Sequence, residues 1–224
     1  MSQPIIPRDN KLWFRLEAHL LDVLQLALEM MRKKEQSFPT LEDSISRILE
    51  KYIRKANEEL RQEDRHVDNL PVFQSQNQPD HNLAEGDSAE KKKPDFLWQW
   101  YDRSEEVDYN RYKQYAIECK RLGKPLSQFC KAYIAEGVCR FINLEHSYSK
   151  YSPSGAMIGY IQSMEVKDIL VEVNEEACNN NIPAIELGAK GWKKKGVSRL
   201  KHKFDRDEVA PTAFTLRHFW LDLQ

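Results

Sequence analysis

The pattern of apolar and polar positions changes its period within the first forty residues. Residues 11–16 alternate as Lys-Leu-Trp-Phe-Arg-Leu, which predicts a short strand with one buried face. From Ala18 onward, apolar residues recur at spacings of three and four, as in an amphipathic helix. A break at residues 37–40, followed by acidic residues, predicts a second helix that begins after Thr40. The N-terminal segment is therefore expected to be strand, helix, helix.

The next segment, residues 64–95, has the composition of a linker. It is rich in Asn, Gln, Asp, Ser, Gly and Pro and holds few large apolar side chains. Such a segment cannot bury enough apolar surface to offset the entropy of ordering it. We expect a disordered polar linker here, with a short interaction motif at residues 70–73 as the alternative.

The middle segment repeats this order of elements. Residues 96–101 are predicted to form a strand, and apolar positions spaced three and four apart predict a helix over 112–122. Gly123 suits the C-terminal cap of that helix, and a further helix is predicted from Ser127 to Ile142. The two segments are offset by 85 residues, so a degenerate internal repeat is one interpretation and chance similarity of leucine-rich patterns is the other.

Beyond residue 150, a stretch rich in Ser, Tyr and Gly leads into a predicted acidic helix over 161–177 and a short helix over 183–190. A basic run and an aromatic-rich end follow. The fold class expected from these patterns is mainly α. It comprises a short N-terminal strand with helix pairs, two helical segments joined by a disordered linker, and a helical or irregular C-terminal part, with boundaries at 1–63, 64–95, 96–150 and 151–224.

Charge, cysteine spacing and apolar runs indicate which classes of protein the chain can belong to. The net charge is −1, which argues against a chain that is basic throughout. The four cysteines form no C-x-x-C pair and have no histidine at zinc-ligand spacing, so no disulfide framework, metal or cofactor is predicted, and Cys130 and Cys139 are expected in the core. A cytoplasmic protein without a membrane partner is expected, because there is no export signal and no run of about 18 apolar residues.

Residues 11–55 resemble the ribbon-helix-helix DNA-binding family, because an alternating strand with cations on one face precedes two helices. In that family, strands from two copies pair into a ribbon that enters the major groove. The resemblance implies that Lys11, Trp13 and Arg15 face DNA and that Thr40 begins a phosphate-facing turn. It also implies a homodimer, unless the similar segment at 96–142 supplies the second strand. An ordinary core of strand and helices is the alternative.

A second candidate site is the basic run over residues 190–203, which holds six lysines and one arginine and no acid. Cations interleaved with an aromatic residue suit neutralisation of phosphates together with stacking. A solvated loop paired with the acidic helix is the alternative. The residues singled out are Lys190, Trp192, Lys193, Lys194, Lys195, Arg199, Lys201 and Lys203.

Common catalytic motifs, such as glycine-rich phosphate loops, H-E-x-x-H and G-x-S-x-G, are absent from the sequence. We therefore expect a non-catalytic DNA- or RNA-binding protein, either a transcriptional regulator or an accessory factor of plasmid, phage or mobile-element processing. A helical adaptor or scaffold that binds another protein is the alternative. An enzyme would require groups that only the fold assembles.

Overall fold

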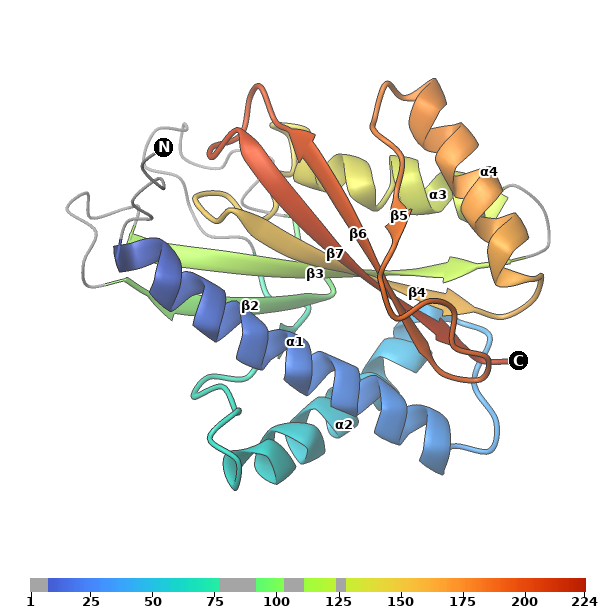
Figure 1. Ribbon diagram of the computed structural model, residues 1–224, viewed down its shortest axis with the longest axis horizontal. Helices are drawn as coiled ribbons and strands as arrows, with labels where there is room; N and C mark the ends of the chain where they lie inside the picture. Colours follow the sequence, from blue (N-terminus) through green and yellow to red (C-terminus); the bar gives the residue numbers. More distant parts are fainter. Residues whose placement is uncertain (1–7, 77–91, 103–110, 124–127) are drawn as a thin grey trace.

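The computed structural model describes residues 8–76, 92–102, 111–123 and 128–224, and over these residues the chain forms one mixed sheet with helices on both faces (Figure 1). The elements are α1 (Arg8–Lys34), α2 (Glu42–Arg61), β1 (Val72–Phe73), β2 (Phe96–Tyr101), β3 (Tyr112–Leu122), α3 (Gln128–Ala135), the 3-10 helix η3 (Val138–Phe141), β4 (Ser154–Ile161), α4 (Val166–Asn179), β5 (Glu186–Leu187), β6 (Val197–Asp205) and β7 (Ala213–Asp222).

The described strands form a seven-stranded sheet in the order β1-β2-β3-β4-β7-β6-β5. The three central strands, β3, β4 and β7, are parallel to one another, and the remaining pairs are antiparallel. Leu122 pairs with Ile161, and Ile161 pairs with Asp222. The carboxyl ends of the three parallel strands therefore lie side by side at one edge, which we call the carboxyl edge.

Helices α1 and α2 cover one face of the sheet, and α3 and α4 cover the other (Figure 1). Each pair of helices closes a separate apolar cluster against the strands. All eight residues of β4 are buried, because this strand is covered from both sides. A strand covered on both faces needs no alternation of apolar and polar residues.

The prediction of a mainly helical chain is wrong, and residues 112–122 are the main reason. They form β3 and not a helix. The apolar residues spaced three and four apart on this stretch resembled a helical stripe only because both faces of β3 are buried, so apolar residues occur without regard to parity. The two segments offset by 85 residues consequently differ in their order of elements, with two helices in the first and two strands before a helix in the second.

The predicted strand over residues 11–16 is also wrong, because these residues belong to α1. Trp13 is buried at the start of a stripe that continues through Glu17 to Leu20 and Leu24. Glu17 is a buried carboxylate that pairs with Arg217 at 3.2 Å. Glu17, a polar residue inside the stripe, interrupted the apolar pattern, so residues 8–17 were not recognised as helical. Without this strand, the predicted two-stranded ribbon has no counterpart here.

Other predictions have mixed outcomes. The strand over 96–101 is confirmed as β2, and the acidic helix is confirmed as α4, although it begins later than expected. Residues 183–190 are not helical, and the C-terminal part contains β6 and β7. Of the predicted linker, residues 77–91 lie outside the described residues. Its described remainder includes β1, and Asn69 accepts a hydrogen bond from the Trp98 indole at 2.9 Å.

Candidate functional site

Strand β3 carries two charged residues that are almost completely buried. Glu118 and Lys120 are 1% and 8% exposed. They are two positions apart, so they lie on the same face of the strand. Glu118 Oε1 accepts hydrogen bonds from Lys120 Nζ at 2.8 Å and from Arg140 Nη1 at 2.5 Å. Burying a charge costs free energy unless it is paired, and these two bonds account for only one oxygen of Glu118.

Asp95 lies next to this pair, just before β2 begins. The antiparallel register pairs Phe96 with Ile117, so one step further along places Asp95 opposite Glu118. The Asp95 carboxylate accepts the backbone N–H of Cys119 at 2.7 Å. Burial and the negative charge of Glu118 raise the pKa of Asp95 to about 8. Two carboxyl groups are thus close together, one on β3 and one just before β2.

A third carboxylate, Glu42, reaches the same place from the first turn of α2. One of its oxygens accepts Lys120 Nζ at 3.0 Å and the other accepts the Arg121 backbone N–H at 2.9 Å. The turn before α2 is fastened to the carboxyl edge, because Arg121 and Gln162 each donate to the Thr40 carbonyl at 3.2 Å. These bonds hold Glu42 over β3.

Lys120 occupies the centre of the cluster. Its ammonium group donates to Glu118, to Glu42 and, at 3.0 Å, to the backbone carbonyl of Cys119. Burial by itself lowers the pKa of Lys120, but the surrounding carboxylates outweigh burial and raise it above its ordinary value. Lys120 is therefore a fixed cation at neutral pH and cannot serve as a proton acceptor.

The cluster is incomplete at one atom. Within the part of the chain that the structure describes, no group donates a hydrogen bond to Glu118 Oε2. Beside the cluster is a hollow of about 340 Å³, and two members of the cluster, Glu42 and Lys120, line it. The residues that line it are Glu42, Lys120, Arg121, Gln128, Phe129, Ala132 and Glu136.

The structure also shows the positions of the N-terminal residues predicted to bind nucleic acid. The Trp13 ring is buried beside Trp98 and Trp100, and its indole nitrogen donates to Ser154 at 3.2 Å. Arg15 is exposed on α1, and the side chain of Lys11 lies outside the described part of the chain. The contribution of Thr40 is its carbonyl, which fastens the turn before α2.

The basic run divides into three groups. Lys193, Lys194 and Lys195 are exposed in the loop before β6, as is Lys190 before them. Trp192 stacks on buried Trp220, with ring centroids 5.9 Å apart. The three cationic residues on β6 alternate with buried residues. Arg199 donates to Gln25 of α1 at 2.8 Å, and Lys201 pairs with Glu186 at 3.1 Å. The third, Lys203, is exposed.

Sequence reasoning missed Asp95, Glu118, Lys120 and Glu42. The available signal was a glutamate and a lysine two positions apart inside an apolar stretch, preceded by an aspartate before the neighbouring strand. In a strand, that spacing puts both charges on one face, whereas in the helix expected for 112–122 it separates them. The error in secondary structure therefore concealed the site.

No family model, curated protein or solved structure matches the chain in the three comparisons made. Among the described residues, no helix combines the length and apolar character needed to cross a bilayer. Those same residues contain no group of three or more His, Cys, Asp and Glu side chains placed to hold a metal ion. The candidate site is therefore assigned a function from its own geometry alone.

Proposed function

We propose that the chain is a metal-dependent hydrolase of phosphate diesters, with its active site at Asp95, Glu118 and Lys120. The observation that carries the proposal is the unpartnered oxygen of Glu118, a buried carboxylate that contacts Lys120. Lys120 in turn lines the hollow beside the cluster. A buried, uncompensated oxygen is costly to a fold. A divalent cation would supply the missing partner.

The groups that would hold the ion are the Asp95 and Glu118 carboxylates. Both bind through oxygen atoms, which suits Mg²⁺. Protein sites for Mg²⁺ commonly use one or two carboxylates and leave the remaining positions to water and substrate phosphate, so a complete group of three side-chain ligands is not required. The bound ion would polarise the phosphate and lower the pKa of a water molecule.

The chain's own residues supply the remaining functions. Lys120 presents a fixed positive charge where negative charge develops on the phosphate, which stabilises the transition state. Glu42 holds that ammonium group in place, and Arg140 holds Glu118 through Oε1. These two are positioning residues. The proposal departs from the expectation of a non-catalytic protein and retains the expectation of a phosphate-bearing partner.

The reaction is a hydrolysis that needs no oxidant or reductant. The oxygen of water forms a bond to phosphorus, and the bond from phosphorus to one ester oxygen breaks. That oxygen leaves with the electron pair and takes up a proton, while the attacking water loses one. The products are a phosphate monoester and an alcohol.

The test is release of nitrophenol from bis(4-nitrophenyl) phosphate with Mg²⁺ or Mn²⁺, compared with EDTA. We expect metal-dependent turnover that falls by at least about a hundredfold in Glu118→Gln, because the variant lacks a ligand charge. The matched control is Glu175→Gln, which removes an exposed carboxylate of α4 and is expected to retain wild-type turnover.

Two outcomes contradict the proposal. Absence of metal-dependent turnover in the wild-type protein removes the hydrolase function. Turnover that survives in Glu118→Gln shows that hydrolysis occurs elsewhere. Thermal unfolding of both variants without metal separates loss of the site from loss of the fold, since a purely structural Glu118 changes stability and not the metal requirement.

A further inference from the structure

The carboxyl edge carries a second cationic feature, the loop of residues 191–196 between β5 and β6. Its backbone is held by three hydrogen bonds. Lys193 N donates to Ser198 Oγ at 2.9 Å, Lys195 N donates to Asp222 Oδ2 at 2.7 Å, and Asp222 N donates to the Gly196 carbonyl at 3.0 Å. The loop is thus a fixed platform from which three consecutive lysine side chains project.

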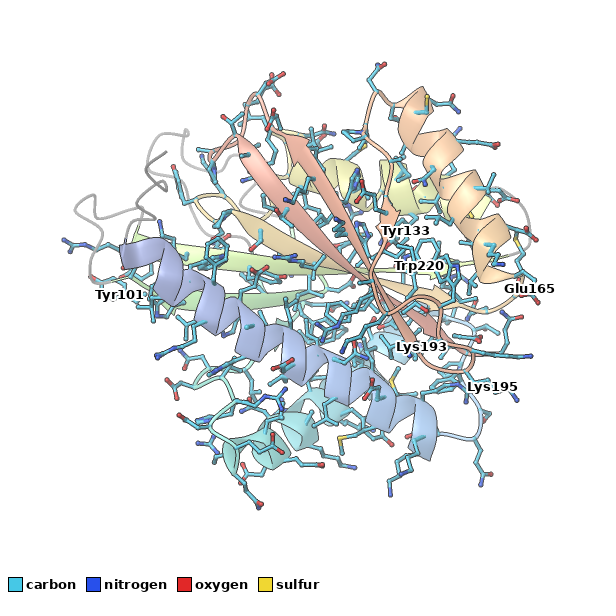
Figure 2. The ribbon with its side chains drawn as sticks, viewed as in Figure 1. Tyr101, Tyr133, Glu165, Lys193, Lys195 and Trp220 are labelled. Carbon is cyan, nitrogen blue, oxygen red and sulfur yellow. The ribbon has the colours of Figure 1, made fainter. Side chains whose placement is uncertain are left out.

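The three lysines border a hollow of about 480 Å³ that reaches the start of α4 and the end of β7. Figure 2 shows Lys193 and Lys195 on the side of the molecule where Glu165 precedes α4. Three acidic residues, Glu165, Asp168 and Asp222, also line the hollow. None of them forms an ion pair with a loop lysine within the described part of the chain, and Asp222 is occupied by backbone N–H groups.

The loop lies at a definite distance from the candidate active site. Glu118 is four residues from Leu122 along β3, which is about 13 Å, and Asp222 is two strands away from Leu122, which is about 10 Å. The two positions are therefore on the order of 16 Å apart. One nucleotide strand advances about 3.4 Å per residue along a helix, so this gap corresponds to about five nucleotides.

We propose that the lysine loop holds the sugar–phosphate backbone of a nucleic-acid strand whose scissile phosphate lies at Glu118 and Lys120. This inference rests on the proposed hydrolase function and names its substrate class. A small diester reaches only the carboxylate cluster, whereas a strand of about six or more nucleotides reaches both places. Trp192 has no part in the contact, because its ring is stacked on Trp220.

The test measures binding of fluorescein-labelled single-stranded DNA of 3 and 12 nucleotides in EDTA, where metal-dependent cleavage cannot occur. The variant is Lys193→Gln with Lys195→Gln. We expect its Kd for the 12-mer to rise about tenfold, and the slope of log affinity against log salt to fall by about 1.4, at roughly 0.7 for each lost phosphate contact. The Kd for the trimer is expected to change much less.

The matched control is Lys51→Gln with Lys55→Gln, which removes the same charge from the exposed side of α2. If this control weakens binding of the 12-mer as much as the loop variant does, the effect is one of net charge and the loop is not the contact. Unchanged affinity and salt slope in the loop variant likewise overturn the inference.

The result of the DNA-binding test can be distinguished from the result of the hydrolysis test. Hydrolysis of bis(4-nitrophenyl) phosphate with no effect of the loop variant on DNA binding retains the active site and rejects the loop. Loop-dependent DNA binding without any metal-dependent hydrolysis retains the loop as a nucleic-acid contact and rejects the hydrolase.

Discussion

Glu118 and Arg206 are both buried charges, and they differ in how their hydrogen bonds are completed. Arg206 is 0% exposed, and each of its guanidinium nitrogens donates to backbone carbonyls, at 3.1 to 3.3 Å. Glu118 is 1% exposed, yet one of its oxygens receives no donor among the described residues. The bonds of Arg206 are complete within the chain, whereas those of Glu118 need a partner from outside. The carbonyls that Arg206 joins belong to Phe141, Tyr148, Ser152, Ala210 and Pro211.

This difference separates a structural charge from a functional one. Arg206 ties the connection before β4 to the turn between β6 and β7, and its guanidinium lies 3.9 Å from the centre of the Phe214 ring. Burial lowers the pKa of Arg206 to about 9, which leaves it a cation at pH 7. Substitutions of Arg206 should therefore lower the free energy of unfolding, and substitutions around Glu118 should lower the rate of hydrolysis.

The largest effect is expected for Arg206→Leu. The substitution leaves several buried carbonyls without donors, and each unsatisfied group costs about 1–3 kcal/mol. We expect the free energy of unfolding to fall by about 5 kcal/mol in urea titrations. The control is Arg15→Leu, an exposed position on α1. A loss below about 1 kcal/mol at Arg206 would falsify its role as a structural clamp.

Lys120→Met is expected to lower the rate of hydrolysis. The methionine keeps most of the side-chain volume and removes the charge, so turnover with saturating metal should fall by about 10²–10³-fold, or about 3–4 kcal/mol in the barrier. The Kd for Mn²⁺ should not weaken, because the positive charge of Lys120 beside Glu118 opposes the binding of a cation there. Lys131→Met, at an exposed position on α3, is the control. A decrease no larger than the loss of folded protein would make Lys120 structural, like Arg206.

His202 and His218 lie between the cases of Arg206 and Glu118, because both rings are buried and each has one ring nitrogen without a partner among the described residues. Their ring centroids are 5.7 Å apart. Burial lowers the pKa of His202 to about 4, and burial with the neighbouring His202 lowers that of His218 well below its ordinary value. Both rings are therefore neutral in the folded protein at pH 7, so no ligand is needed to compensate a charge.

Stability is expected to fall between pH 6.5 and pH 4. Below pH 6.5 the unfolded chain protonates these rings and the folded chain does not, so the unfolded state binds more protons and is favoured as the pH decreases. His202 alone contributes about 3 kcal/mol by pH 4. Urea titrations from pH 7 to pH 4.5 should show a shallower decline in His202→Gln. An unchanged slope relative to wild type would contradict this assignment.

Helix α4 was predicted correctly because it has a single buried face. Helix α4 has a polar side and an apolar side, so its period is visible in the sequence. Strand β3 is covered on both faces, so its residues show no alternation and were interpreted as helical. Residues 8–17 of α1 were missed for a different reason, because the buried carboxylate of Glu17 is paired with Arg217, a residue 200 positions away.

The candidate site was not found from the sequence, because β3 was predicted to be a helix and because the members of the site come from separate parts of the chain. Glu42 belongs to α2, Asp95 precedes β2, and Glu118 lies on β3. These residues lie close together only because of the antiparallel register of β2 on β3 and the turn held by the Thr40 carbonyl. Charge runs, by contrast, are visible in the sequence, and the lysines at 193–195 are exposed, as a binding surface requires.

The smallest change in the free energy of unfolding is expected at an exposed ion pair, which serves as the reference for the buried charges. Lys201 contacts Glu186 at 3.1 Å, but the two side chains are 52% and 66% exposed. Water compensates both charges when the pair is broken, so Lys201→Ala should change the free energy of unfolding by about 0.5 kcal/mol or less in urea titrations. Glu186→Ala is the matched control and should behave in the same way. A loss above about 2 kcal/mol would mean that an ion pair in water stabilises this fold as much as a buried one does. Incomplete hydrogen bonding at Glu118 would then no longer distinguish a functional charge from a structural one.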